Sequence, residues 1–207
     1  MPPRWSQDGP DLRLELLDVP QHDRARLLAV ALQNRTQKCV AGVPWPDRCG
    51  VVTGSADAVA VLWLGPDEFL LVSSDETVIP EELTDRQDRE PGALISLATH
   101  PLTVRMSREL ARAGSFGQVV DLSANRTTLE LSGPSARAVL EKGCHVDLHP
   151  RAFGPGKAVS TTLGPVQVLL WQVGDNEYRI MPRASFGDYT VKWLLDAMTE
   201  FTSAKVA

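Results

Sequence analysis

Six consecutive residues, Cys144 to His149 (CHVDLH), bring together a thiol, two imidazoles and a carboxylate. All of these groups bind zinc in proteins. A tetrahedral zinc site usually takes its ligands from separate segments, however, because one extended segment points alternate side chains to opposite faces. In the alternative interpretation, Asp147 and His149 close a turn before Pro150 by bonding nearby backbone N–H groups, and Cys144 packs under the preceding helix. We favour the turn and assign no metal ligand.

Other catalytic patterns are also weak. Ser132 lies at a predicted helix start with no assigned base, and no Gly-x-Ser-x-Gly elbow is present. His22 is expected in the first turn of a helix and His100 directly before a proline, both at exposed positions. Residues 153–157 (FGPGK) lack the spacing and the trailing Ser/Thr of a phosphate loop. We therefore predict no catalytic, cofactor-binding or metal-binding residue.

The three cysteines, Cys39, Cys49 and Cys144, are too few and too irregularly spaced for a disulfide framework. Reduced thiols, some of them buried, are the expected state. A disulfide between Cys39 and Cys49 stays an alternative, although no secretory context supports it.

Composition narrows the classes of function. Of the 207 residues, 43% are hydrophobic and 23% are charged, as in ordinary globular proteins. The formal net charge of -5 argues against nucleic acid as the main partner. No apolar run approaches the length of a membrane span, and the first residues lack the layout of a secretory signal. A cytoplasmic protein without membrane contact is expected.

Periodicity predicts the elements of the first half. Alternation predicts a strand over 12–17, and apolar residues at helical spacing (Ala25, Leu28, Ala29, Leu32) predict a helix over 23–33. The remaining predictions are an irregular connection over 38–54, strands over 59–64 and 68–73 around a turn, a surface loop over 75–91 and a helix over 102–113.

Three arginines follow one side of the helix predicted over 102–113. Arg105, Arg108 and Arg112 form a basic stripe opposite the apolar side chains. Such a stripe is typical of a solvated face, and it is at best a contact surface for an acidic partner.

The second half reads as hairpin, helix, hairpin, helix. Strands over 119–123 and 127–131 are predicted to pair as a hairpin, and a helix begins at 132–134 and ends at Gly143 in a left-handed conformation. A second hairpin is predicted from strands over 166–173 and 178–181. The last helix is expected to be capped by Ser185 with Asp188, with an apolar face of Phe186, Tyr189, Trp193, Leu194, Ala197, Met198 and Phe201.

A weak internal repeat links the two halves. Residues 60–72 (AVLWLGPDEFLLV) parallel residues 168–181 (VLLWQVGDNEYRIM) if one residue is inserted, which matches Trp63 with Trp171. The repeat favours an α+β fold of two related sheet-and-helix lobes with mostly antiparallel strands, over approximately 10–115 and 116–203.

Several motifs resemble a known family. These motifs occur in order along the chain: WLGPDEFLL (63–71), DLSANRTTLELSGPSARAVLEKGC (121–144), DLHPRAF (147–153) and SFGDY with WLLDA (185–197). Together they resemble the gamma subunit of heterotetrameric sarcosine oxidase and, more distantly, the folate-binding module of the glycine-cleavage T-protein. The chain departs from the family at His145, where proline is expected, and in the acidic segment 75–91.

The resemblance implies a non-catalytic subunit of a four-chain flavoenzyme that oxidatively demethylates sarcosine to glycine. FAD, FMN, NAD, tetrahydrofolate and zinc would then bind in the other subunits and none in this chain. The alpha, beta and delta subunits would be the partners, with alpha as the most direct contact. Trp5, Trp45 and the basic stripe are candidate contacts.

The same resemblance implies that this chain lacks the catalytic residues of the T-protein module. T-proteins carry an acidic pair on the strand that enters the second hairpin, and Val166 and Gln167 stand at those positions. Glutamine cannot take up or deliver a proton at neutral pH. Asp121 and Arg126 remain from the DLS-x-x-R pattern and are expected to pin a hairpin. The alternatives are a stand-alone aminomethyltransferase-like folate binder, or the same subunit role with another N-methyl amino acid as substrate.

Overall fold

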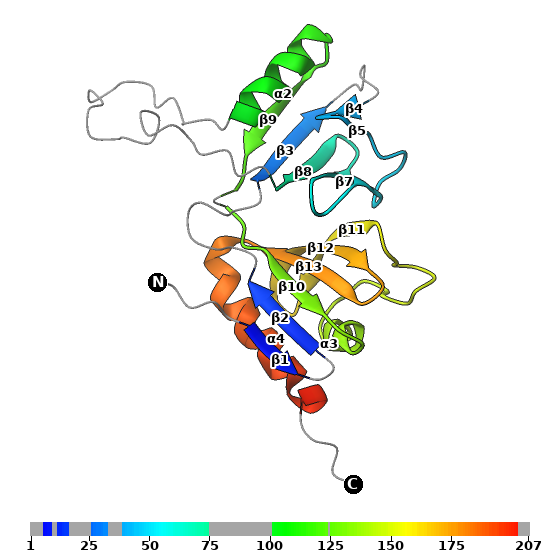
Figure 1. Ribbon diagram of the computed structural model, residues 1–207, viewed down its shortest axis with the longest axis vertical. Coiled ribbons are helices and arrows are strands. Elements are labelled where there is room, and N and C mark those ends of the chain that lie inside the picture. The colour runs from blue at the N-terminus through cyan, green and yellow to red at the C-terminus, as the bar shows by residue number, and fades with distance from the viewer. Residues whose placement is uncertain are drawn as a thin grey trace, which may run out of the picture.

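The computed structural model describes residues 6–9, 12–16, 26–32, 39–74, 101–123 and 125–202. Within these residues the chain forms two antiparallel sheets, with helices on their outer faces (Figure 1). The α+β architecture predicted from the repeat is confirmed. The predicted loop over 75–91, His22, His100 and Trp5 lie outside the described residues.

The first sheet has five strands in the order β6-β7-β8-β3-β9. A two-stranded ribbon, β4-β5, and helix α2 accompany it. The bounds are β3 Arg26–Leu32, β4 Cys39–Val40, β5 Val43–Pro44, β6 Val52–Gly54, β7 Val59–Gly65, β8 Glu68–Ser73, α2 Pro101–Arg112 and β9 Gly117–Asp121. The predicted strands over 59–64 and 68–73 and the helix over 102–113 are confirmed. The connection over 38–54 is mainly irregular but holds the short strands β4, β5 and β6.

The second sheet has six strands in the order β1-β2-β10-β13-β12-β11. Helices α3 and α4 and the short 3₁₀ helix η1 accompany it. The bounds are β1 Ser6–Gly9, β2 Leu12–Leu16, β10 Leu129–Ser132, α3 Ala136–Glu141, β11 Lys157–Leu163, β12 Val166–Gly174, β13 Glu177–Pro182, η1 Ala184–Phe186 and α4 Gly187–Thr202. The strand predicted over 12–17 and the hairpin over 166–181 are confirmed.

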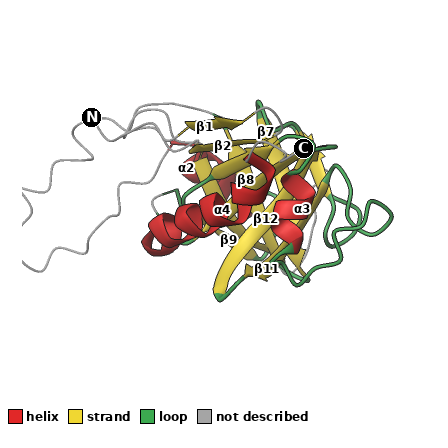
Figure 2. Cartoon of the chain, turned by 90° about the horizontal axis from the view of Figure 1, so that it is seen from below, coloured by secondary structure: helices red, strands yellow, loops and turns green. Residues whose placement is uncertain are grey.

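The sheets and helices form stacked layers (Figures 1 and 2), and three apolar clusters fill the space between them. One lies between the first sheet and α2, where Phe69 and Met106 are buried. Another lies between the two sheets, where Leu62 and Trp171 are buried. The third lies between the second sheet and α3 and α4. Because both faces of the first sheet are covered, β7 and β8 read as nearly continuous apolar runs.

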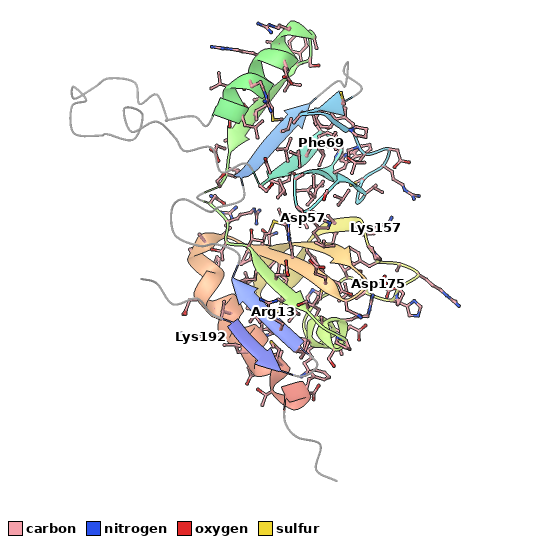
Figure 3. All side chains as sticks on the ribbon, viewed as in Figure 1. Arg13, Asp57, Phe69, Lys157, Asp175 and Lys192 are labelled. Carbon is pink, nitrogen blue, oxygen red and sulfur yellow. The ribbon has the colours of Figure 1, made fainter. Side chains whose placement is uncertain are left out.

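Backbone hydrogen bonds also join the two sheets. Val52 N donates to Gly156 O at 2.8 Å, and Ala158 N donates to Gly50 O at 3.0 Å. Figure 3 shows Asp57, next to β7, and Lys157 of β11 near this junction. The two sheets therefore meet through paired backbone as well as through side chains.

The internal repeat is present, but in a different register from the predicted one. Both hairpins carry an irregularity at the same place: Gly65 pairs with Glu68 in one, and Gly174 pairs with Glu177 in the other. Aligning these pairs needs no inserted residue, and it matches Trp63 with Gln172 rather than with Trp171. The predicted alignment superposed the two tryptophans, whereas the structural repeat aligns the β-bulges of the two hairpins.

The helix predicted over 23–33 is wrong, because Arg26–Leu32 forms β3 between β8 and β9. A run of leucine and alanine fits helical spacing as well as it fits alternation. Val30 is buried against the α2 side, whereas its neighbour Ala31 is exposed. Pairing with two neighbouring strands gives the β3 backbone partners on both edges, and this tertiary context overrides the weak helical preference.

The hairpin predicted over 119–131 is also wrong. β9 pairs with β3 in the first sheet, whereas β10 pairs with β2 and β13 in the second. The residues between β9 and β10 therefore carry the chain from one sheet to the other. Each sheet takes a strand from across the predicted lobe boundary at 115/116, while the division into domains stays a prediction.

The helices of the second sheet agree with the prediction in their cores and differ at their ends. Ala136, Val139 and Leu140 of α3 are buried as expected. Gly143 is not among the described glycines with a positive φ, so it is not the predicted left-handed stop. Ser185 lies inside η1, and the helical turn before α4 has no side-chain cap.

Candidate functional site

The segment from Asp147 to Phe153 is a closed turn. Asp147 Oδ1 accepts a hydrogen bond from His149 N at 2.9 Å, and His149 Nδ1 accepts one from Arg151 N at 3.2 Å. The carbonyl of His149 accepts from Ala152 N and Phe153 N at 2.8 and 2.9 Å. The predicted structural role of Asp147 and His149 is confirmed.

These bonds leave the turn poorly suited to zinc. The Asp147 carboxylate and the His149 Nδ1 already accept backbone hydrogen bonds, and His145 Nδ1 lies 3.0 Å from Thr162 Oγ1. In the described part of the chain, no group of three or more His, Cys, Asp or Glu side chains is placed to hold a metal ion. The residues of this turn are therefore assigned to backbone closure.

All three cysteines are free thiols. Cys39 and Cys49 are exposed, whereas Cys144 is half-buried and packs against the core between the second sheet and its helices. The packing of Cys144 under α3 agrees with the prediction, and the alternative disulfide is not formed.

The positions that would hold the acidic pair of a T-protein open strand β12. Val166 is buried in the core, and Gln167 points to solvent opposite Thr162 of β11. An apolar side chain and an exposed amide supply no proton donor or acceptor for acid–base chemistry at neutral pH.

Asp121 and Arg126 hold the segment that passes between the sheets. Asp121 Oδ1 accepts bonds from Ser123 N at 2.9 Å and Ser123 Oγ at 2.6 Å. Arg126 donates from Nη1 to Met181 O at 2.9 Å and pairs through its backbone with Arg183. These contacts replace the predicted role in a hairpin with one in the inter-sheet connection.

Arg126 lies in an unfavourable electrostatic setting. Burial lowers its pKa, the nearby Arg183 lowers it further, and only Glu68 acts in the opposite direction. Its Nε is buried and has no hydrogen-bond partner in the described part of the chain. The Arg126 guanidinium is therefore incompletely neutralised.

A second partly buried cation, Arg179, has an ion-pair partner within the fold, although its Nε makes no hydrogen bond in the described part of the chain. Its Nε lies 3.6 Å from Glu130 Oε2, and its Nη1 donates to Ala56 O at 3.1 Å. The guanidinium also lies 5.3 Å from the centre of the Trp171 ring. Since Ala56 belongs to the other lobe, Arg179 serves to join the two sheets.

The residues predicted as contacts differ in their exposure. Arg105, Arg108 and Arg112 are exposed on α2 as expected. Trp45 is half-buried, because its ring packs edge-on against Phe69 at 4.9 Å, so it is not the exposed aromatic that was expected, and its contact with a partner stays a prediction.

Two aromatic residues that were expected in the core are instead exposed. Phe186, the last residue of η1, and Tyr189, in the first turn of α4, are 48% and 45% accessible. Helical spacing placed both on the apolar face with Leu194 and Met198, whereas the structure turns Gly187 and Thr190 to the core instead. Across the described residues, no helix is long and apolar enough to cross a membrane.

Comparison with known proteins decides the family. The profile of the sarcosine oxidase gamma subunit family matches residues 100–200. Sarcosine oxidase subunit gamma from Corynebacterium sp. (strain P-1) is 46% identical over 166 residues, which cover 80% of this chain and 70% of that protein. The chain belongs to the sarcosine oxidase gamma subunit family. The subunit gamma of Arthrobacter sp. is 45% identical over the same share of both chains.

Solved structures agree with membership of the gamma subunit family. A chain of the heterotetrameric sarcosine oxidase from Corynebacterium sp. U-96, solved in complex with pyrrole 2-carboxylate, matches with a TM-score of 0.68 and 36% identity. The match covers 97% of this chain and 90% of that chain. The glycine cleavage system aminomethyltransferase T from Bartonella henselae shares the fold at a TM-score of 0.53 and 14% identity, over 84% of this chain and 44% of that one.

Proposed function

We propose that this chain is the non-catalytic gamma subunit of a heterotetrameric sarcosine oxidase that oxidatively demethylates sarcosine to glycine. The observation that carries the proposal is the match to a chain of such a heterotetramer over nearly the whole length of both chains at 36% identity. Since that structure is a heterotetramer, other subunits are the expected partners.

A structural role fits the residues that the fold brings together. The turn at Asp147 and His149 is closed by its own hydrogen bonds, and Arg179 pairs with Glu130 inside the molecule. Val166 and Gln167 offer no acid–base group at the position where a T-protein carries carboxylates. The polar groups of Asp147, His149 and Arg179 are therefore used within the fold.

On this proposal the cofactors of the complex belong to the other chains. FAD, FMN, NAD, tetrahydrofolate and zinc are expected in the larger and smallest subunits, and none in this one. The alpha subunit is the proposed direct contact, alongside beta and delta in the assembly. A permanent contact of this kind is expected to bury about 2,000 Å² or more.

Co-expression with the other subunits tests the proposal. We expect a tagged form of this chain to recover a yellow four-chain complex that oxidises sarcosine, whereas the chain alone is colourless and inactive. A flavin absorbance spectrum in the isolated chain, or recovery of the chain without partners, would overturn the proposal. Replacing sarcosine with other N-methyl amino acids in the same assay identifies the substrate.

The alternative, a stand-alone aminomethyltransferase-like folate binder, has the shared fold as its support, and that match covers 44% of the aminomethyltransferase chain. Titration of the isolated chain with tetrahydrofolate separates the two functions. Binding at micromolar concentration would favour the alternative, and its absence is expected for the gamma subunit.

A further inference from the structure

The start of α4 packs on the core with one side and carries exposed aromatic side chains on another. Leu194, Ala197 and Met198 are buried against the second sheet. At the start of α4, Gly187 and Thr190 are also buried, whereas Tyr189 and the preceding Phe186 of η1 are about half accessible, at 45% and 48%. Two large aromatic side chains left together in water are unfavourable and are typical of a surface that a partner covers.

Two arginines lie beside these aromatic side chains. Arg183 directly precedes η1 and is exposed, and its backbone bridges to Arg126. Within the described residues Arg183 makes no ion pair, and its charge lowers the pKa of Arg126. The nearest carboxylate along α4, Asp188, is already paired with Lys192 at 2.7 Å. Glu68 offsets part of the charge of Arg126, so Arg183 carries the exposed positive charge of this pair, in a chain whose net charge is -5.

Backbone contacts fix the arginines and the aromatics relative to one another. Ala184 N donates to Asn125 O at 2.8 Å, which ties η1 to the inter-sheet connection. Gly187 begins α4 so close to Thr127 that an added Cβ would lie 3.4 Å from Thr127 Oγ1. The backbones of Arg126, Arg183, Phe186 and Tyr189 therefore lie close together, with Arg126 partly buried and the other three side chains exposed, and we call this region the α4 entrance surface.

The composition of the α4 entrance surface identifies the chemistry of what binds it. Aromatic residues and arginine are the types enriched in the cores of protein–protein interfaces and among their energetic hot spots. The two guanidinium groups attract carboxylates, while the two rings need an apolar counterpart. A small anion would leave both rings in water.

We propose that the α4 entrance surface is where this chain docks on a larger subunit of the oxidase, through a site with carboxylates facing the arginines and an apolar pocket for Phe186 and Tyr189. The inference rests on the proposed function. A second copy of this chain fits less well, because a two-fold contact through this surface would bring its own arginines against each other.

The test uses the full chain with the co-expressed partner subunits. A Phe186→Ala/Tyr189→Ala double variant and a separate Arg183→Glu variant are measured for affinity to the complex that lacks this chain. We expect each to weaken binding by about tenfold or more, the loss typical of hot-spot residues. Both changes replace exposed side chains, so the fold of the isolated chain should be retained, as circular dichroism will check.

Matched controls come from the other end of the molecule. The end of α2 and the turn that follows it lie far from α4 (Figure 1), and they provide an exposed arginine, Arg112, and an aromatic residue, Phe116, that is 73% accessible. Phe116→Ala and Arg112→Glu should leave the affinity within about twofold of wild type, since exposed residues outside an interface contribute little. Loss of binding in Arg112→Glu with retention in Arg183→Glu would place the contact on the α2 arginines and overturn the inference.

The remaining outcomes separate the inference from the proposed function. Failure of the wild-type chain to bind any partner subunit would reject the proposed function itself. Normal binding of wild type and of both α4 variants would reject only the docking surface. Concentration-dependent dimerisation of the isolated chain that the double variant abolishes would assign the surface to self-association instead.

Hydrogen exchange gives a readout that does not depend on any variant. Amides of residues 184–190 in the wild-type chain should exchange at least several-fold more slowly in the complex than in the isolated chain. Unchanged exchange there, with protection elsewhere, would contradict the inference.

Discussion

At the scale of single residues, Gly143 shows how packing replaces a predicted backbone role. Its spacing after α3 suggested a left-handed stop, but its φ is not positive. A Cβ at this position would lie 2.5 Å from Trp193 Cζ2 and 3.0 Å from Cη2. The absence of a side chain lets the α4 indole lie directly on the end of α3.

Gly143→Ala is therefore expected to lower the free energy of unfolding by about 1–3 kcal/mol, the usual cost of overpacking a core. Chemical denaturation of the isolated chain measures the change. Gly154→Ala is the matched control, since the nearest atom to its added Cβ is Pro150 O at 3.6 Å, and it should be nearly neutral. Equal effects of the two variants would argue against the Trp193 contact as the cause.

Tyr178 is a fully buried residue whose ionisation makes the stability of the fold depend on pH. Burial raises the pKa of its phenol above the ordinary 10.0, with Arg137 acting in the opposite direction and Glu141 in the same one. The hydroxyl has no hydrogen-bond partner within the described chain. Because the native state holds the proton more tightly than the unfolded state does, the resulting stability is present below about pH 10 and is lost as pH rises through the raised pKa.

Wild type should therefore lose about 1 kcal/mol relative to Tyr178→Phe between pH 8 and pH 10.5. At pH 8 the two proteins should be nearly equal, because no hydrogen bond is removed. The measurement is the free energy of unfolding of both proteins in urea at each pH. A constant difference across this range would show that the phenol does not titrate with unfolding.

At the scale of elements, the two bulged hairpins are built alike. Gln172 is completely buried, and its Nε2 donates to Gly174 O and Asp175 O at 3.1 Å each. Trp63, at the equivalent position of the other hairpin, donates from its ring nitrogen to Gly65 O. Each lobe therefore satisfies the carbonyl at its bulge with a side-chain donor two residues earlier, although the donors differ in chemistry.

Gln172→Leu and Trp63→Phe should each lower the free energy of unfolding by about 1–3 kcal/mol, because each leaves a turn carbonyl without its side-chain donor. Thermal and urea denaturation will measure both. Gln167→Leu, an exposed glutamine on the same strand β12, is the control and should change stability by less than about 0.5 kcal/mol. Stability unchanged in both variants would mean that water replaces the donor.

At the scale of the whole molecule, the apolar layer between the sheets makes the lobes interdependent. Leu62 of the first sheet is fully buried there, in the same cluster as Trp171 of the second. The connection held by Asp121 and Arg126 and the backbone bonds near Gly156 add to this contact. We expect the chain to unfold in one cooperative step.

Leu62→Ala should lower the free energy of unfolding by about 2–5 kcal/mol while keeping a single transition. Coincident midpoints by far-ultraviolet circular dichroism and tryptophan fluorescence test this expectation. Val120→Ala, which truncates a side chain that is 42% accessible, is the control and should be nearly neutral. Two separated transitions, with only one shifted by Leu62→Ala, would show that the lobes unfold independently.

The sequence alone was sufficient where local chemistry decides the outcome. Apolar runs on both sides of a turn signature predicted β7, β8, β12 and β13, because a hairpin and its turn are set by neighbours along the chain. The turn at Asp147 and His149 was predicted for the same reason, since its bonds span two residues. The ordered motifs also identified the family that the comparisons found.

Only the tertiary structure decided what depends on partners distant in sequence. β3 is a strand because β8 and β9 supply its hydrogen bonds. β9 and β10 do not pair with each other, because each pairs with strands of a different sheet. Likewise, the spacing of α4 placed Phe186 and Tyr189 on an apolar face, but the assembled fold buries Gly187 and Thr190 at the start of α4 and leaves the two rings exposed. Periodicity records which side of an element is apolar, whereas what covers that side is a property of the assembled fold.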